Sequence, residues 1–212
     1  MADYVTLADP FEDPRQQSQA NFLGMYVFLG TETMLFGALL ALVFTYRLSH
    51  PQAAYEAARH LLMWVAAANT AVLLTSSLFV AIAVVAARHG RRRAVVGWLV
   101  AALALGVVFL ALKGFEYAVD FHEGLAPMIG PPALLRFSAS ALFIDLYFVA
   151  TGLHAIHLTV GLFVLGWAAA SVRRGRVALP RQAVVLEMTG LYWHFVDVVW
   201  VFVFPIFYLA RG

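Results

Sequence analysis

Five long apolar runs constrain the fold of this chain more than any other feature. Each exceeds the ~20 residues that a helix needs to cross a bilayer, and each is too continuous for a β-strand. Inside lipid a backbone must satisfy its own hydrogen bonds, which a helix does. The runs cover residues 20–46, 60–87, 94–118, 138–172 and 186–210. The sequence therefore predicts an all-α membrane protein, a bundle of five transmembrane helices over residues 20–212 behind a polar tail at residues 1–19.

Composition narrows the classes of protein and of cofactor. The chain is 63% hydrophobic and 12% charged, whereas a soluble domain carries about 25% charged residues. It has no cysteine, which excludes disulfides, thiolate metal sites, iron–sulfur clusters and covalent haem attachment through a CxxCH motif. No nucleophile triad is evident, and nothing points to nucleic acid. We therefore expect no catalytic residue in this chain.

Arginines in the connections between the runs predict the direction of the helices. Four lie in the connection RHGRRR and four in VRRGRVALPR. With Arg15 in the tail, nine fall on one side, and the other side has four, which are Arg47, Arg59, Arg136 and Arg211. The positive-inside rule then predicts a cytoplasmic N-terminus and a C-terminus outside. The outer connection Ala126–Pro132 is rich in turn residues, so we expect it to be ordered but not helical.

Some of the inner arginines are also candidates for contacts with lipid. Anionic headgroups at a cytoplasmic membrane surface attract clustered basic side chains. The candidates for these headgroup contacts are Arg88, Arg91, Arg92, Arg93, Arg173 and Arg174.

Five ionisable residues fall at about the same depth in the predicted bilayer. They come from the first, fourth and fifth runs and are Glu32, His154, His157, His194 and Asp197. The two histidines of the fourth run are three residues apart, as are the histidine and aspartate of the fifth, so each pair lies on one helix face. Because ionisable groups in lipid normally face protein, we predict a buried hydrogen-bonded cluster. In it Glu32 bonds to His157 or His154, and the pair from the fifth run closes the cluster or forms a second pair.

A second polar group is predicted nearer the outer surface. Lys113 and Glu116 lie three residues apart in the third run, and Asp145 enters the fourth run at a similar level. A buried lysine requires a carboxylate partner. We expect a structural ion pair between Lys113 and one of these two carboxylates.

The histidines leave other interpretations open. A His-x-x-His pair with a carboxylate on another helix could bind a metal, but di-iron bundles use more carboxylates than this layer offers. Haem held between histidines of the fourth and fifth runs is also conceivable. We favour a structural cluster without metal, and a cluster that titrates or contacts lipid remains open. For Glu32 both a structural role and a role in proton or lipid contact stay open.

Several segments resemble subunit III of the haem–copper oxidases, the cytochrome c oxidase type. The segment Tyr192–Phe204, YWHFVDVVWVFVF, is similar to the closing signature of that family. The other similar segments are TETMLFGAL (Thr31–Leu39), NTAVLLTSS (Asn69–Ser77), LKGFEYAVDFHEG (Leu112–Gly124) and FVATGLHAIHLTVG (Phe148–Gly161). Many members have seven helices. This chain, with five, is similar to short bacterial members, which include quinol-oxidase and nitric-oxide-reductase versions.

The resemblance implies an accessory subunit without a redox centre of its own. Such a subunit packs beside catalytic subunit I, which carries haem and copper, and it binds membrane phospholipid and supports proton uptake. Glu32 would be the family's membrane-embedded carboxylate, and the histidines and Asp197 its buried polar positions. We therefore predict subunit III of a proton-pumping terminal oxidase, which reduces dioxygen in aerobic respiration, in a bacterial plasma membrane. The alternatives are a quinol oxidase or nitric oxide reductase subunit, and an independent proton or ion transporter.

Overall fold

The computed structural model describes residues 14–125 and 138–209, and every regular element in these ranges is a helix. The helices are α1 (Pro14–Ser49), α2 (Pro51–His60), α3 (Met63–Arg88), α4 (Arg92–His122), α5 (Ser138–Arg173) and α6 (Ala183–Tyr208). All except α2 are long and apolar enough to cross a membrane. The predicted all-α bundle with five membrane spans is therefore confirmed, and the chain is a multi-pass membrane protein.

Helix α2 is an additional element that lies between two predicted spans. It starts with proline at its first helical position, where the missing backbone N–H costs no hydrogen bond. One face carries four buried alanines, which are Ala53, Ala54, Ala57 and Ala58. This face packs on α5, while Tyr55 on the other face is exposed. At ten residues, α2 is too short and too polar for a search based on apolar runs.

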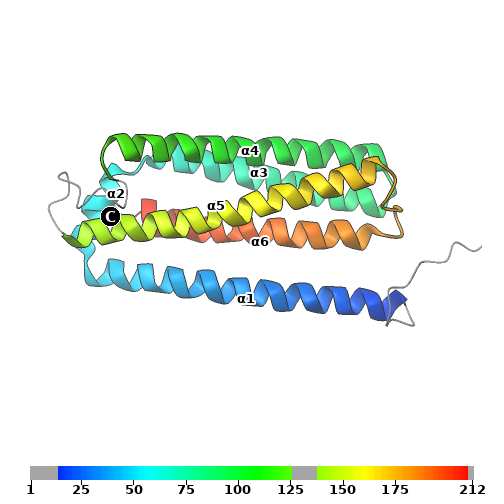
Figure 1. The fold of residues 1–212 in the computed structure, drawn as a ribbon, viewed down its shortest axis with the longest axis horizontal. Helices are drawn as coiled ribbons and strands as arrows, with labels where there is room; N and C mark the ends of the chain where they lie inside the picture. The colour runs from blue at the N-terminus through cyan, green and yellow to red at the C-terminus, as the bar shows by residue number, and fades with distance from the viewer. Residues whose placement is uncertain (1–13, 126–137, 210–212) are drawn as a thin grey trace, which may run out of the picture.

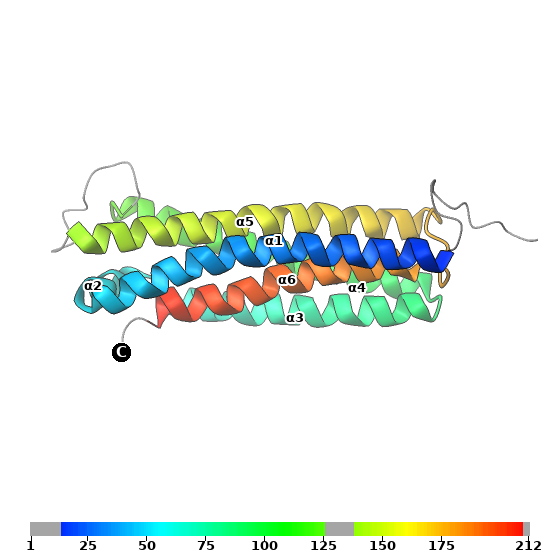
Figure 2. The ribbon, with the colours of Figure 1, turned by 90° about the horizontal axis from the view of Figure 1, so that it is seen from below.

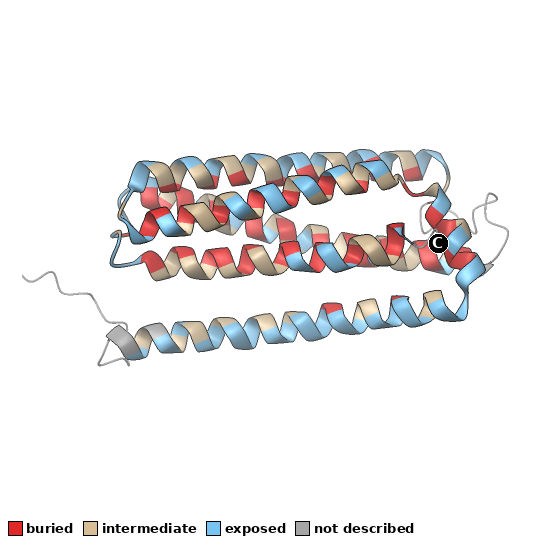
Figure 3. Ribbon diagram, turned by 180° about the vertical axis from the view of Figure 1, so that it is seen from behind, coloured by how far each residue is buried: buried red, intermediate tan, exposed pale blue. Residues whose placement is uncertain are grey.

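Helices α3 to α6 form the core of the molecule, and α1 lies beside it (Figures 1 and 2). Helix α3 packs on α4 and α6, and α5 packs on α4 and α6, so the four helices close into a bundle. Helix α1 contacts this bundle mainly along α5 and α6. Its apolar window is 11% buried, against 28% to 50% for the other four spans. Figure 3 shows the exposed residues that cover α1.

One tryptophan of α6 explains why the core helices approach closely. Trp193 is fully buried, and its ring lies against Gly106 of α4 and Gly161 of α5. A Cβ at Gly106 would lie 2.7 Å from the side chain of Leu162 and 2.9 Å from the tryptophan ring. A Cβ at Gly161 would lie 3.0 Å from the same ring. The two glycines therefore let three helices meet around one large side chain, because small residues allow helices in membranes to pack closely.

The two arginine-rich connections lie at one end of the bundle. The connections α3–α4 and α5–α6 are next to the start of α1, whereas α2 and the end of α6 lie at the opposite end (Figure 1). The predicted loop Ala126–Pro132 and the arginines Arg136 and Arg211 fall outside the described residues, as does the side chain of Arg15.

Candidate functional site

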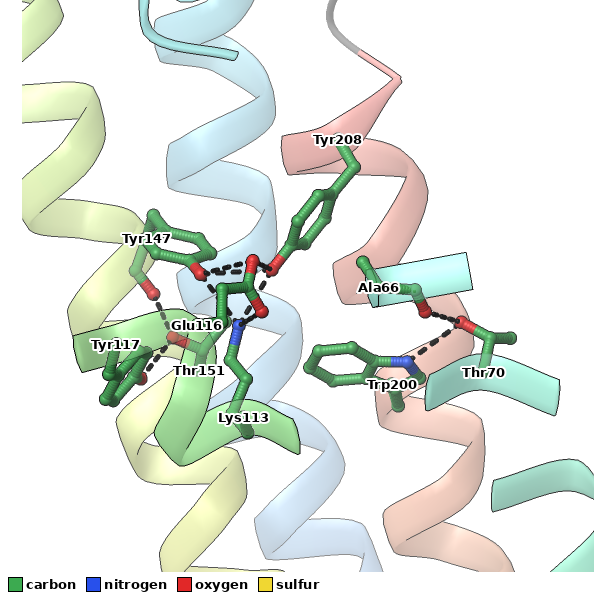
Figure 4. A network of polar contacts seen from close by, with 9 residues as sticks. All are labelled: Ala66, Thr70, Lys113, Glu116, Tyr117, Tyr147, Thr151, Trp200 and Tyr208. Atoms are coloured by element: carbon green, nitrogen blue, oxygen red, sulfur yellow. Dashed lines mark hydrogen bonds and ion pairs between the residues drawn. The ribbon is translucent and has the colours of Figure 1, made fainter. Parts of the chain in front are cut away.

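A buried lysine joins three core helices. Nζ of Lys113 on α4 donates to Glu116 Oε2 at 3.0 Å and to the hydroxyls of Tyr147 on α5 and Tyr208 on α6, each at 2.7 Å. Both tyrosines donate in turn to Glu116 Oε1, at 3.1 and 2.7 Å. None of the four residues is more than 2% exposed, and Figure 4 shows how they face one another. The lysine thus uses all three of its N–H donors inside the protein.

Of the two carboxylates that were candidates for the partner of Lys113, Glu116 pairs with it and Asp145 does not. Among the described side chains, no hydrogen bond or ion pair joins Asp145 to Lys113, and Asp145 is half-buried. It precedes Tyr147 by two residues, which corresponds to about 200° around a helix. The two side chains therefore leave α5 on nearly opposite sides, and only Tyr147 faces Lys113.

Two further contacts reinforce the core around this lysine. The hydroxyls of Tyr117 on α4 and Thr151 on α5 are 2.6 Å apart. Trp200 on α6 donates its indole N–H to Thr70 on α3 at 3.0 Å (Figure 4). Neither contact has a signal in the sequence, because each partner alone resembles an ordinary residue of an apolar helix.

Glu32 and His157 form the contact between α1 and α5. Nε2 of His157 lies 3.0 Å from Glu32 Oε2, and Nδ1 of the same ring lies 2.9 Å from the carbonyl of Leu153. A carbonyl only accepts, so Nδ1 carries a hydrogen. The remaining bond then joins either an imidazolium to a carboxylate or a neutral carboxyl to a neutral ring. In both cases one proton is held between the two side chains.

The fifth predicted span contributes a separate contact. Nδ1 of His194 lies 2.6 Å from the hydroxyl of Ser77, which joins α6 to α3. Asp197 is 3% exposed, and neither of its carboxyl oxygens has a hydrogen-bond partner among the described residues. Asp120, near the C-terminal end of α4, is also buried without a hydrogen-bond partner among the described residues, and it was not among the predicted polar residues.

His154 occupies a third environment. Its ring is buried between Phe109, at a centroid distance of 5.7 Å, and Trp200, at 5.1 Å. Neither ring nitrogen has a hydrogen-bond partner among the described residues. The structure therefore brings Glu32 and His157 together and places His154, His194 and Asp197 at other contacts.

The geometry of α5 explains this separation. Three residues correspond to about 300°, or 60° short of a full turn. This offset is enough for His154 to face α4 and α6 while His157 faces α1, because these helices flank α5 on different sides.

A groove of about 440 Å³ lies between α1, α5 and α6. Its walls are mostly apolar and include Met25 and Phe28 of α1, Trp167 of α5 and Tyr192 of α6. On α1 its lining runs from Asn21 to Phe28, about 10 Å at about 1.5 Å per residue. That length is about a third of the ~30 Å hydrocarbon core of a bilayer. The Glu32–His157 contact lies beyond the end of this groove that is nearer the middle of the helices.

Polar contacts also attach the C-terminal end of α1. The hydroxyl of Tyr46 donates to the carbonyl of Ala139 on α5 at 3.0 Å. The guanidinium of Arg47 donates, over 3.1 to 3.5 Å, to three carbonyls near the end of α6, which are those of Pro205, Ile206 and Leu209. A helix end leaves its last carbonyls without intrahelical donors, and although the carbonyl of Pro205 also accepts from the N–H of Leu209, Arg47 supplies a donor to all three carbonyls. Arg47 therefore caps α6 and holds α1 against it.

The arginine-rich end has one ion pair among the described residues, between Arg88 and Glu187 at 2.8 Å. The other arginines predicted to contact lipid headgroups are exposed at this end, and they are Arg91, Arg92, Arg93, Arg173 and Arg174. Within residues 14–125 and 138–209, no three or more histidine, aspartate or glutamate side chains are grouped so that they could hold a metal ion.

Comparison with known proteins gives matches that cover nearly the whole chain. The model of the family described as Cytochrome c oxidase subunit III matches residues 16–211. The quinol oxidase subunit 3 of Bacillus subtilis (strain 168) is 32% identical over 205 residues, 94% of this chain and 92% of that protein. The cytochrome c oxidase subunit 3 of Alkalihalophilus pseudofirmus is 32% identical over 199 residues, 91% and 88% of the two chains.

A further relative matches a similar share of the chain. The probable quinol oxidase subunit 3 of Staphylococcus aureus (strain USA300) is 29% identical over 195 residues, 91% of this chain and 90% of that protein. Family match and relatives agree on a subunit 3 of a respiratory oxidase. The chain belongs to the cytochrome c oxidase subunit III family.

Proposed function

We propose that this chain is the accessory subunit III of a proton-pumping terminal oxidase in a bacterial plasma membrane. Its partner is catalytic subunit I, which carries the haem and copper groups and reduces dioxygen to water. The observation that carries this proposal is the match of the family over residues 16–211. The bonds of Lys113, Glu32 and His194 to other helices fit a subunit whose polar interior holds helices together.

The subunit supports the complex partly by holding a bound phospholipid. The groove between α1, α5 and α6 is mostly apolar and about 10 Å long, which suits part of an acyl chain. We place the arginine-rich end on the cytoplasmic side because basic connections stay inside. The groove then opens toward the inner leaflet, and Glu32 and His157 lie near the membrane centre. In this position the subunit supports proton uptake and protects the catalytic subunit during turnover.

A quinol is the second candidate for the electron donor, beside cytochrome c. The relatives from Bacillus subtilis and Staphylococcus aureus are named quinol oxidase subunits, whereas the one from Alkalihalophilus pseudofirmus is named a cytochrome c oxidase subunit. The naming of the first two favours quinol for this chain. A nitric oxide reductase partner remains the less supported alternative.

Purification of the tagged chain from its native membrane tests the proposal. An accessory subunit should carry with it a haem-containing subunit that consumes dioxygen. Oxygen uptake with a reduced quinol, compared with uptake with reduced cytochrome c, then identifies the donor. A chain that purifies without any haem protein and moves protons by itself in vesicles would instead be a transporter.

A further inference from the structure

One imidazole near the middle of the spans keeps an unmet hydrogen bond at the surface of the bundle. His194 lies eleven residues after Ala183, where α6 begins, and its contact Ser77 lies eleven residues before Arg88, where α3 ends. Both are therefore about 16 Å from the arginine-rich end at about 1.5 Å per residue, which is about half of the ~30 Å hydrocarbon core of a bilayer. The ring of His194 is only partly buried. Its Nδ1 contacts Ser77, whereas its Nε2 has no hydrogen bond to any residue that the structure describes.

Other polar side chains at the surface of the spans are satisfied by this chain itself. Glu32 and His157 bond to each other. The exposed hydroxyls of Thr33 on α1 and Thr75 on α3 donate to carbonyls of their own helices, at 2.7 and 2.8 Å. Acyl chains offer no hydrogen-bond partner, and ionisable side chains within membranes normally face protein. The free Nε2 of His194 therefore points to a protein partner outside this chain.

The contact with Ser77 determines which group that partner must supply. A hydroxyl inside a helix commonly donates to a carbonyl three or four residues back, as those of Thr70 and Thr75 do. Ser77 makes no such bond among the described residues, and neither carboxyl oxygen of the nearby Asp197 has hydrogen-bond geometry to it. The hydroxyl of Ser77 therefore donates to Nδ1 of His194, at 2.6 Å. The N–H of the ring then lies on Nε2, so the partner must offer a hydrogen-bond acceptor.

The surface around this N–H is a strip of α6 that faces outward. His194 faces α3, whereas Phe195 faces α1, with which its ring packs. Val198 and Phe202, four and eight residues after His194, lie about 40° and 80° around the helix from it and thus between these two directions. They are 51% and 58% exposed, and in Figure 2 α6 lies between α1 and α3. Apolar side chains with one polar group suit a second membrane helix, because hydrogen bonds and packing join helices in lipid.

We propose that the strip of His194, Val198 and Phe202 docks a transmembrane helix of another subunit, which accepts a hydrogen bond from Nε2 of His194 through a carboxylate or hydroxyl oxygen. A lipid does not meet this requirement, because its oxygens lie at the headgroup level and not at this depth. A second copy of the chain would bring a second donor to the contact. The inference rests on the proposed function only for the complex in which it is tested.

Photo-crosslinking in the native membrane tests this contact. Val198→p-benzoylphenylalanine places a crosslinker on the strip, and mass spectrometry identifies what it captures. We expect a membrane helix of a different protein, and the crosslink should fall about tenfold when His194→Leu is added, since one interhelical hydrogen bond is lost. His194→Gln keeps an N–H donor and should keep most of the crosslink. Thr75→Val, at a similar depth on the exposed side of α3, is the control and should leave the yield unchanged.

The possible outcomes separate this inference from the proposed function. Equal crosslinking with His194→Leu and with Thr75→Val would overturn the docking contact, as would a product at Val198 that holds only lipid or a second copy of this chain. Co-purification of a haem protein without any crosslink to another protein would do the same and leave the proposed function intact. A crosslink to another membrane protein in a preparation without haem would instead support the contact and contradict the proposed function.

Discussion

The core of four helices and the outlying helix α1 are held by different kinds of contact. In the core, Lys113 and Glu116 bond to tyrosines of two other helices, and Trp193 fills the space that two glycines leave. Helix α1 has few buried residues and is attached at the middle by Glu32 and at its C-terminal end by Tyr46 and Arg47. The difference teaches that packing in the core sets the stability of the subunit, while α1 forms one wall of the apolar groove.

The largest effect is expected where the core network is broken. Lys113→Leu leaves Glu116 buried without its cation, and removal of one partner of a buried pair costs about 3–5 kcal/mol. Thermal denaturation of the purified complex, followed by loss of this subunit, measures the effect. Lys113→Leu/Glu116→Gln should recover most of the stability, because the uncompensated charge is gone.

Asp145→Asn is the control for this prediction. Asp145 lies on α5 near the network but does not bond to Lys113, so its change should be small. A Lys113→Leu protein as stable as the unaltered one would show that the ion pair does not stabilise the core.

The second largest loss of stability is expected where helices pack closely around Trp193. Gly106→Ala places a methyl group 2.9 Å from the tryptophan ring and 2.7 Å from Leu162, and such overpacking costs about 1–3 kcal/mol. Gly114→Ala on the same helix meets nothing within 4 Å and should be neutral or slightly stabilising, since alanine is the better helix former. Denaturation midpoints of both variants test the contrast. Equal midpoints would mean that α4 shifts without cost.

The attachment of the C-terminal end of α1 should contribute less to stability. Arg47→Gln removes the charge from the hydrogen bonds to the end of α6, and the loss should be about 1 kcal/mol. Hydrogen exchange should rise in the last turn of α6 and in the C-terminal half of α1, and remain unchanged in α4. A uniform rise over all helices would contradict the idea that α1 is attached independently of the core.

The smallest effect on stability is expected at Glu32. Glu32→Gln keeps a side chain of the same size that can still bond to His157, so the chain should fold with a stability changed by less than about 1 kcal/mol. We expect altered phospholipid content and faster inactivation of the complex during turnover, because the contact lies at the end of the groove. Thr33→Val, on the exposed face of the same helix, serves as control. Unchanged lipid content and inactivation would argue against a role of Glu32 beyond packing.

The length of the apolar runs was sufficient to predict the membrane spans. The polar contacts between the helices could be predicted only in part. The positions of Glu32 and of the two histidines His154 and His157 predicted a contact with one of the two, because few ionisable residues lie in apolar runs. Tyr147 and Tyr208 could not be found in this way, because tyrosine is common in membrane helices and its hydroxyl is not a rare group there. Helix α2 was missed because its buried face consists of alanines, which give a weak apolar signal.

Five membrane-spanning helices, and arginines in two of their connections, can be read from the amino-acid sequence alone. Both follow from local properties, namely the length of the apolar runs and the charge between them. Which helix each polar side chain faces cannot be read in this way, because that depends on how the folded helices are rotated and placed around one another. The separation of His154 from His157 results from this arrangement.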